Sequence, residues 1–186
     1  MDSSGEKPKI LVVDDTVANL KLLQDMLRQS GYDPRPCPNG PMALRAASSD
    51  IPDLILLDIN MPEMDGYEVC DHLKKDERLV DVPVIFISAL NETSDKVEAF
   101  RRGGVDYISK PFHFEEVKAR IDTHVALRRY RLELRKHNDH LTEMVEDRTR
   151  ETLLAKEELS QAQMATIMAM CKIAEARDDD TGKHFE

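Results

Sequence analysis

The chain has 186 residues, enough for one domain of ordinary size and an additional segment. A net charge of -10 argues against a nucleic acid or an anionic membrane surface as the main partner, and we expect neither. The sequence has no signal-peptide core and no apolar run of the roughly 18 residues needed to span a bilayer. Its three cysteines are far apart and lack metal-ligand spacing, so we expect a cytoplasmic protein with reduced thiols.

In the first two-thirds of the chain, short apolar runs alternate with amphipathic segments. Runs at 10–13, 54–57 and 84–87 are too short for helices and are typical of strands buried on both faces of a parallel sheet. Weaker strand candidates are 32–37 and 105–109. Amphipathic segments predict helices at 17–29, 41–48, 66–75 and 94–102, with glycines near their ends. This order, strand then helix five times over, predicts an α/β fold with a doubly wound parallel sheet.

From about Glu115 onwards, helix formers and charged residues dominate, and no glycine or proline occurs before Gly182. Such a length predicts a continuous signalling helix. Asn138 falls on the heptad seam of this helix, and an asparagine at an a position favours a parallel dimer in fixed register. The pattern therefore predicts a coiled coil and a homodimer, although a single helix packed on its own domain is the alternative. Apolar or small residues at a or d positions are Leu134, Leu141, Val145, Ala155, Leu159, Ala162, Ala169, Ile173 and Ala176, and polar ones are Asn138, Arg148, Thr152 and Thr166.

Polar groups follow the predicted strands at their carboxyl ends, which is where open α/β sheets gather their working residues. Asp14 and Asp15 follow the first strand, and Asp58 follows the third. Three clustered carboxylates repel one another unless a cation shares the site, and hard oxygen ligands select Mg²⁺. Ser88 ends the fourth strand and Lys110 follows the fifth. Together these are the parts of a site that forms an aspartyl phosphate.

Residues from about Lys9 to Val125 resemble the receiver domain of two-component response regulators. The matching segments are Val12-Val13-Asp14-Asp15, Leu57-Asp58-Ile59-Asn60-Met61-Pro62-Glu63-Met64-Asp65-Gly66, Ile87-Ser88-Ala89 and Asp106-Tyr107-Ile108-Ser109-Lys110-Pro111-Phe112. Several separated motifs in the right order make this resemblance specific. It implies a flavodoxin-like fold of five βα units and a phosphorelay partner, a sensor histidine kinase.

The resemblance also implies a role for each residue of the acidic site. Asp58 would take the phosphoryl group from the phosphohistidine of the kinase. Asp15 would bind Mg²⁺ directly, Asp14 mostly through water, and Asn60 through its backbone carbonyl.

Three further residues would act on the phosphoryl group or respond to it. Ser88 and Lys110 would bind its oxygens, and the peptide bond before Pro111 is commonly cis in the family. Tyr107 matches the family's switch aromatic, whose ring fills the space that Ser88 vacates on moving toward the phosphoryl group.

The last residues, 173–186, resemble the opening of an HD-GYP domain, a metal-dependent phosphodiesterase of cyclic di-GMP. Glu175 and His184 would match residues at or near its metal site, but the His-Asp pair and the Gly-Tyr-Pro segment that complete the site are absent. We therefore expect no enzyme activity from this chain beyond loss of its own phosphoryl group. The expected organisation is a receiver domain at 6–125, a signalling helix at 126–176 and the start of an output domain at 177–186.

Other readings stay open or are weaker. The same receiver could regulate a diguanylate cyclase or a serine phosphatase, or a degenerate receiver could serve as a dimerisation scaffold. A haloacid-dehalogenase phosphatase needs an Asp-x-Asp motif at its first strand, which Asp14-Asp15-Thr16 does not supply. His184 as the phosphoacceptor of a kinase is disfavoured because Phe185-Glu186 does not resemble that family's histidine box.

Overall fold

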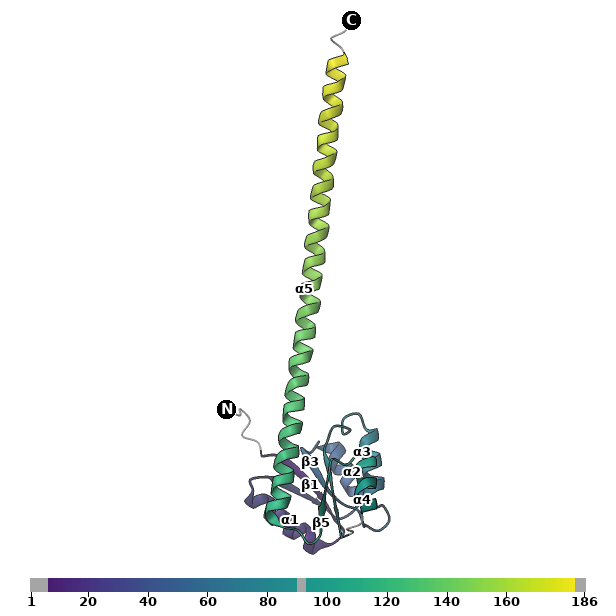
Figure 1. The fold of residues 1–186 in the computed structure, drawn as a ribbon, viewed down its shortest axis with the longest axis vertical. Coiled ribbons are helices and arrows are strands. Elements are labelled where there is room, and N and C mark those ends of the chain that lie inside the picture. The colour runs from purple at the N-terminus through teal and green to yellow at the C-terminus, as the bar shows by residue number, and fades with distance from the viewer. Residues whose placement is uncertain (1–6, 90–92, 183–186) are drawn as a thin grey trace. The chain divides into compact units, whose positions relative to one another are not determined.

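The computed structural model describes residues 7–89 and 93–182 of the chain. The five strands form one parallel sheet in the order β2-β1-β3-β4-β5, and helices cover both of its faces (Figure 1). The strands are β1 (Lys9–Val13), β2 (Asp33–Cys37), β3 (Leu54–Asp58), β4 (Val84–Ser88) and β5 (Asp106–Ser109). The helices are α1 (Val17–Gln29), α2 (Gly40–Ser49), α3 (Gly66–Lys75), α4 (Thr93–Arg101) and α5 (Phe114–Gly182). The predicted flavodoxin-like fold and the predicted long C-terminal helix are both confirmed.

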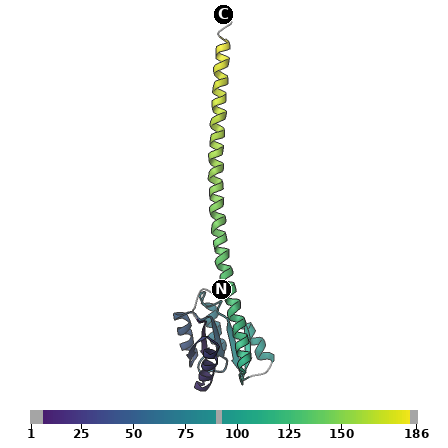
Figure 2. The same cartoon turned by 90° about the vertical axis from the view of Figure 1, so that its left-hand side faces the viewer.

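Alternate residues of each central strand point to opposite faces of the sheet, so the apolar runs bury side chains on both. On one face, Leu11, Ile55 and Phe86 pack against α2, α3 and α4. On the other face, Ile10 and Leu56 pack against α1 and the first turns of α5. The two views of the ribbon show the same division of helices between the faces (Figures 1 and 2). A buried central sheet fixes the ends of its strands, and those ends carry the site described below.

Local polar signals set the helix starts. Asp65 caps α3, where its side chain accepts a hydrogen bond from Glu68 N at 2.8 Å and Glu68 returns one to Asp65 N at 3.0 Å. Asn39 caps α2 in the same way by accepting from Met42 N. Each cap satisfies amide groups that the first turn of a helix cannot pair internally.

The chain divides into two compact units, Met1–Leu132 and Glu133–Glu186. Helix α5 contributes to both, because Val117, Ile121 and Val125 are buried against the sheet in the first unit. In the second unit, the described side chains are exposed. No helix among the described residues is both long and apolar enough to cross a membrane.

Candidate functional site

Four adjacent strands bring the predicted site residues to one edge of the sheet. Asp14 and Asp15 follow β1, Asp58 is the last residue of β3 and Ser88 is the last residue of β4. Lys110 follows β5, after a Ser109 that lies beside Ser88 in the sheet. The peptide bond between Lys110 and Pro111 is cis.

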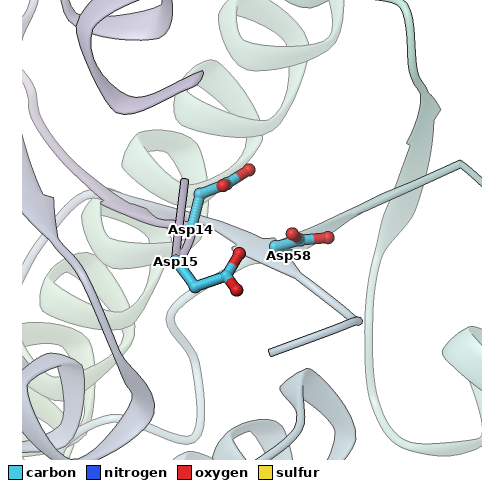
Figure 3. Close-up of side chains that lie close together, drawn as sticks. All are labelled: Asp14, Asp15 and Asp58. Atoms are coloured by element: carbon cyan, nitrogen blue, oxygen red, sulfur yellow. The ribbon is translucent and has the colours of Figure 1, made fainter. Parts of the chain in front are cut away.

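The three aspartates form a compact acidic cluster (Figure 3). One carboxylate oxygen from each of Asp14, Asp15 and Asp58 lies within 4.8 Å of the others. Asp14 and Asp58 are buried, whereas Asp15 is exposed. Oxygen donors at this spacing, one of them open to water, fit a hard cation such as Mg²⁺, which keeps several of its own waters. The donor set therefore suits the predicted metal.

Lys110 bridges the two buried carboxylates. Its Nζ lies 2.9 Å from Asp14 Oδ2 and 2.8 Å from Asp58 Oδ2. Burial raises the pKa of Asp58, and this effect outweighs the lowering by Lys110. Burial lowers the pKa of Lys110, but Asp58 and Asp14 more than compensate and hold it above its usual range. A second cation beside Asp58 would favour the ionised form that a nucleophile requires.

Two residues that the sequence reasoning missed hold Asp14 in place. Asn19 Nδ2 donates to Asp14 Oδ1 at 3.1 Å and to Oδ2 at 3.0 Å, and the Thr16 amide donates to Oδ1 at 2.8 Å. Both lie at the start of α1, directly after the acidic pair. The signal in the sequence was an amide side chain in the first turn of a helix that begins at the edge of the site.

The remaining predicted residues lie around this cluster. Ser88 and Tyr107 are both buried, Ser88 fully and Tyr107 within the core on the α2–α4 side of the sheet. Asn60 is exposed, and its backbone amide donates a hydrogen bond to Asp58 Oδ1 at 3.4 Å. Among the described residues, the polar or charged side chains that are buried are Asp14, Asp58 and Ser88, so the buried polar groups of the fold converge on this edge.

Gly66 packs directly against the backbone of Asp58 and Ile59. The Gly66 amide donates to Ile59 O at 2.9 Å, and a Cβ at this position would lie 2.3 Å from the Asp58 carbonyl oxygen. Only glycine allows α3 to begin this close to the end of β3. The loop between them is stabilised further by the Asp65–Glu68 cap described above.

The predicted output-domain residues lie elsewhere in the chain. Glu175 is in the last turns of α5, and only its backbone is described; His184 lies outside the described residues. The structure thus brings together the residues of the acidic site and leaves the resemblance at 173–186 as a prediction.

Comparison with known families identifies the class of protein. Residues 10–122, more than half of the chain, match the response regulator receiver domain family. The chain belongs to this family. Receiver domains typically take phosphoryl groups from histidine kinases, bind Mg²⁺ at an acidic pocket and are linked to output domains, and this chain has an acidic cluster of three aspartates.

Curated relatives differ in how far along the chain they match. The transcriptional regulator RpaA of Synechocystis is 40% identical over 114 residues, covering 61% of this chain and 47% of RpaA. Response regulator PleD of Caulobacter vibrioides is 41% identical over 113 residues, covering 61% of this chain and 25% of PleD. A Vibrio cholerae protein named "probable cyclic di-GMP phosphodiesterase" is 35% identical over 176 residues, covering 95% of this chain and 38% of its own length. The chain therefore spans less than half the length of these relatives.

Solved receiver structures share the fold. The Francisella response regulator 1452 receiver domain superposes with a TM-score of 0.61 at 31% identity, covering 64% of this chain and 98% of that one. The receiver domain of sensor histidine kinase PA1611 from Pseudomonas aeruginosa superposes with a TM-score of 0.61 at 29% identity, covering the same shares of the two chains. That structure has a magnesium ion coordinated in its active-site cleft.

Proposed function

We propose that Asp58 is the phosphoacceptor of this receiver. The observation that carries the proposal is the convergence of the buried polar side chains, Asp14, Asp58 and Ser88, at one edge of an otherwise apolar core. A carboxylate oxygen of Asp58 attacks phosphorus, the bond from phosphorus to the donor breaks, and an acyl phosphate forms on Asp58.

The neighbouring groups act on the charge that moves during the transfer. Lys110, which lies 2.8 Å from Asp58, pairs with the phosphoryl oxygens, and the Ser88 hydroxyl donates to them. Asp14, Asp15, Asp58 and the Asn60 carbonyl would hold Mg²⁺, and the ion would supply positive charge that offsets the negative charge of the transferring phosphoryl group. Tyr107 responds to the displacement of Ser88 and carries the change to the face of α4, β5 and α5.

Intact-mass spectrometry tests this assignment. The chain is incubated with acetyl phosphate in the presence and absence of Mg²⁺, beside an Asp58→Ala variant. We expect one added phosphoryl group that needs both Mg²⁺ and Asp58. A correctly folded chain that gains no mass, or an Asp58→Ala variant that gains it equally, refutes the assignment and favours the scaffold reading.

We also propose that the receiver signals through a homodimeric α5 to a cyclic di-GMP phosphodiesterase. The support is that the similarity to the Vibrio cholerae relative runs through the helix, whereas that to RpaA and PleD extends over 113–114 residues. Joining this chain to the remaining segment of that relative tests the proposal. Acetyl phosphate should change the rate of cyclic di-GMP hydrolysis in this chimaera, and Asp58→Ala should abolish the change. A rate that is unaffected in both would favour another output, such as a cyclase.

A further inference from the structure

The second unit of the chain presents a row of exposed apolar side chains. Leu134, Leu141, Val145 and Leu159 are 57–69% exposed, although each occupies an a or d position of the heptad that places Asn138 at a. A groove of about 440 Å³ follows the same side of the helix, between Leu141 and Thr152. A row at this spacing matches the side of a helix that inserts knobs into the holes of another helix.

Of the polar residues in this row, the two threonines and Asn138 are compatible with burial. The Thr152 hydroxyl donates to Arg148 O at 2.8 Å, and the Thr166 hydroxyl donates to Ala162 O at 2.9 Å. Burying them against a second helix leaves no unpaired hydroxyl. Asn138 occupies an a position, where identical residues meet in the same layer of a parallel dimer and can pair by their amide groups.

The charges beside the row determine which partner fits. Glu151 occupies a g position, and Lys156 occupies the e position of the next heptad. In a parallel, in-register dimer, the g position of one helix faces the e position of the next heptad of the other helix. Each Glu151 therefore meets a Lys156 of the second copy. In an antiparallel dimer, g positions face g positions of the other helix, and the charge complementarity between Glu151 and Lys156 is lost.

Lys156 has no acidic residue three or four positions away on its own helix, the spacing at which side chains face one another. The positions three and four residues away are Thr152, Leu153, Leu159 and Ser160. Glu151 lies 3.5 Å from Arg148 on its own helix, and both side chains are largely exposed. The Lys156 charge therefore gains an ion-pair partner in the parallel dimer that its own helix does not provide.

We propose that the row from Leu134 to Ala169 is a docking surface for the same row of a second copy of this chain, in a parallel, in-register coiled coil. Reciprocal ion pairs between Glu151 and Lys156 of the two copies fix its orientation and register. This inference rests on the homodimer of the proposed function and adds its geometry.

Charge reversal tests the ion pairs. Sedimentation equilibrium at low salt would compare the dimer dissociation constant of the parent chain with those of Glu151→Lys, Lys156→Glu and the double variant. Each single reversal turns two attractions into two repulsions and should raise the constant about tenfold. The double reversal should restore it to near the parent value, and high salt should reduce all differences.

Glu157→Lys is the matched control for Glu151→Lys. Glu157 occupies an f position on the outer side, with only Leu153, Leu154, Ser160 and Gln161 three and four residues away. Glu157→Lys should therefore leave the dimer dissociation constant unchanged. A parent chain that stays monomeric, or a double variant as weak as the single ones, overturns the proposal.

Disulfide formation tests the register independently. Ala155 occupies a d position, whereas Cys171 is an exposed cysteine at an f position. Under mild oxidation, Ala155→Cys in a Cys171→Ser background should cross-link two copies rapidly, and the parent chain should not. Cross-linking of the parent without cross-linking of Ala155→Cys overturns the parallel seam.

Labelling with acetyl phosphate separates this inference from the phosphoacceptor assignment. Each variant of the helix should take up the same phosphoryl mass as the parent. A failed dimer with normal labelling refutes only the helix geometry, and failed labelling with a normal dimer refutes only the assignment of Asp58.

Discussion

Lys110 contacts two of the carboxylates that we propose as Mg²⁺ ligands. Lys110 lies within 3 Å of both Asp14 and Asp58, so its positive charge already offsets part of their repulsion. A bound Mg²⁺ would add positive charge beside that lysine, and the repulsion would weaken metal binding. In the proposed function the lysine is nonetheless required, because it would pair with the oxygens that carry charge during phosphoryl transfer.

Replacing Lys110 by methionine should therefore have opposite effects on metal binding and on chemistry. We expect Lys110→Met to bind Mg²⁺ about tenfold more tightly in calorimetric titrations, because the competing charge is gone. The rate of labelling by acetyl phosphate should fall by about a hundredfold. Lys21→Met, at an exposed position on α1, is the control and should change neither quantity. Weaker Mg²⁺ binding by Lys110→Met would contradict this account.

Asp106 at the start of β5 holds the first turns of α5 in place. It accepts hydrogen bonds from the Tyr107 amide at 2.8 Å and from Arg120, and His124 Nε2 lies 3.0 Å from it. Partial burial raises the pKa of Asp106, but these partners outweigh that effect and hold the pKa below its usual range. The ionised group therefore contributes stability above the unfolded-state pKa of about 4, and this contribution is lost as the pH falls through the folded-state value.

The Asp106→Asn variant tests this pH dependence. At neutral pH it should lower the free energy of unfolding by about 1–3 kcal/mol, because charge-assisted hydrogen bonds are lost. The difference from the parent should shrink as the pH falls below about 4 and on through the lower folded-state pKa, at which Asp106 becomes protonated in the folded parent. The difference in the free energy of unfolding is measured by urea titration over this pH range, with circular dichroism as the signal. A difference that does not depend on pH would mean that the carboxylate charge is not involved.

At the scale of elements, the apolar runs were the strongest signal. The runs at 10–13, 54–57 and 84–87 predicted β1, β3 and β4 to within one residue at each end, because strands buried on both faces have little choice of residue. The aspartates that end two of these runs predicted the edge of the acidic cluster. Asn19 had only a weak local signal, its place in the first turn of the helix after the acidic pair. The close approach at Gly66 was not predictable, since it depends on how α3 approaches the end of β3 rather than on any local pattern.

The junction between β3 and α3 should not tolerate a side chain at Gly66. In Gly66→Ala the new methyl group would meet the Asp58 carbonyl oxygen and Ile59 Cα, which are backbone atoms that cannot move independently. We expect a loss of about 3 kcal/mol of stability and slower labelling of Asp58. Gly40→Ala is the comparison variant, because its close neighbours are side-chain atoms of Val69 and Met64 rather than backbone atoms, and it should lose less stability. Thermal unfolding measures both variants. A loss of stability in Gly66→Ala that is equal to or smaller than that in Gly40→Ala would contradict this explanation.

At the scale of the whole molecule, the folding core and the proposed dimerisation surface are on different segments. Both apolar clusters of the fold lie between Ile10 and Val125, inside the first compact unit. The second unit has exposed apolar side chains along its helix. Stability of the receiver should therefore not depend on association of the helix.

Truncation after Leu132 tests this separation. A fragment of residues 1–132 should unfold cooperatively, be monomeric by sedimentation and take up the phosphoryl group on Asp58 to the same extent as the whole chain. The whole chain should sediment as a dimer. If the fragment is unfolded, or if it dimerises as tightly as the whole chain, the two properties are not separable.

The concentration of buried polar groups at the acidic cluster has a consequence for evolution and engineering. Asp14, Asp58 and Ser88 interrupt a core that is otherwise apolar, and such positions are places where an apolar residue of similar size often raises stability. Mutations selected only for thermal tolerance would accumulate at the residues to which we assign the chemistry. Phosphoryl transfer and thermal stability thus favour different residues at this edge of the sheet. A screen that measures stability alone would first select variants that can no longer signal.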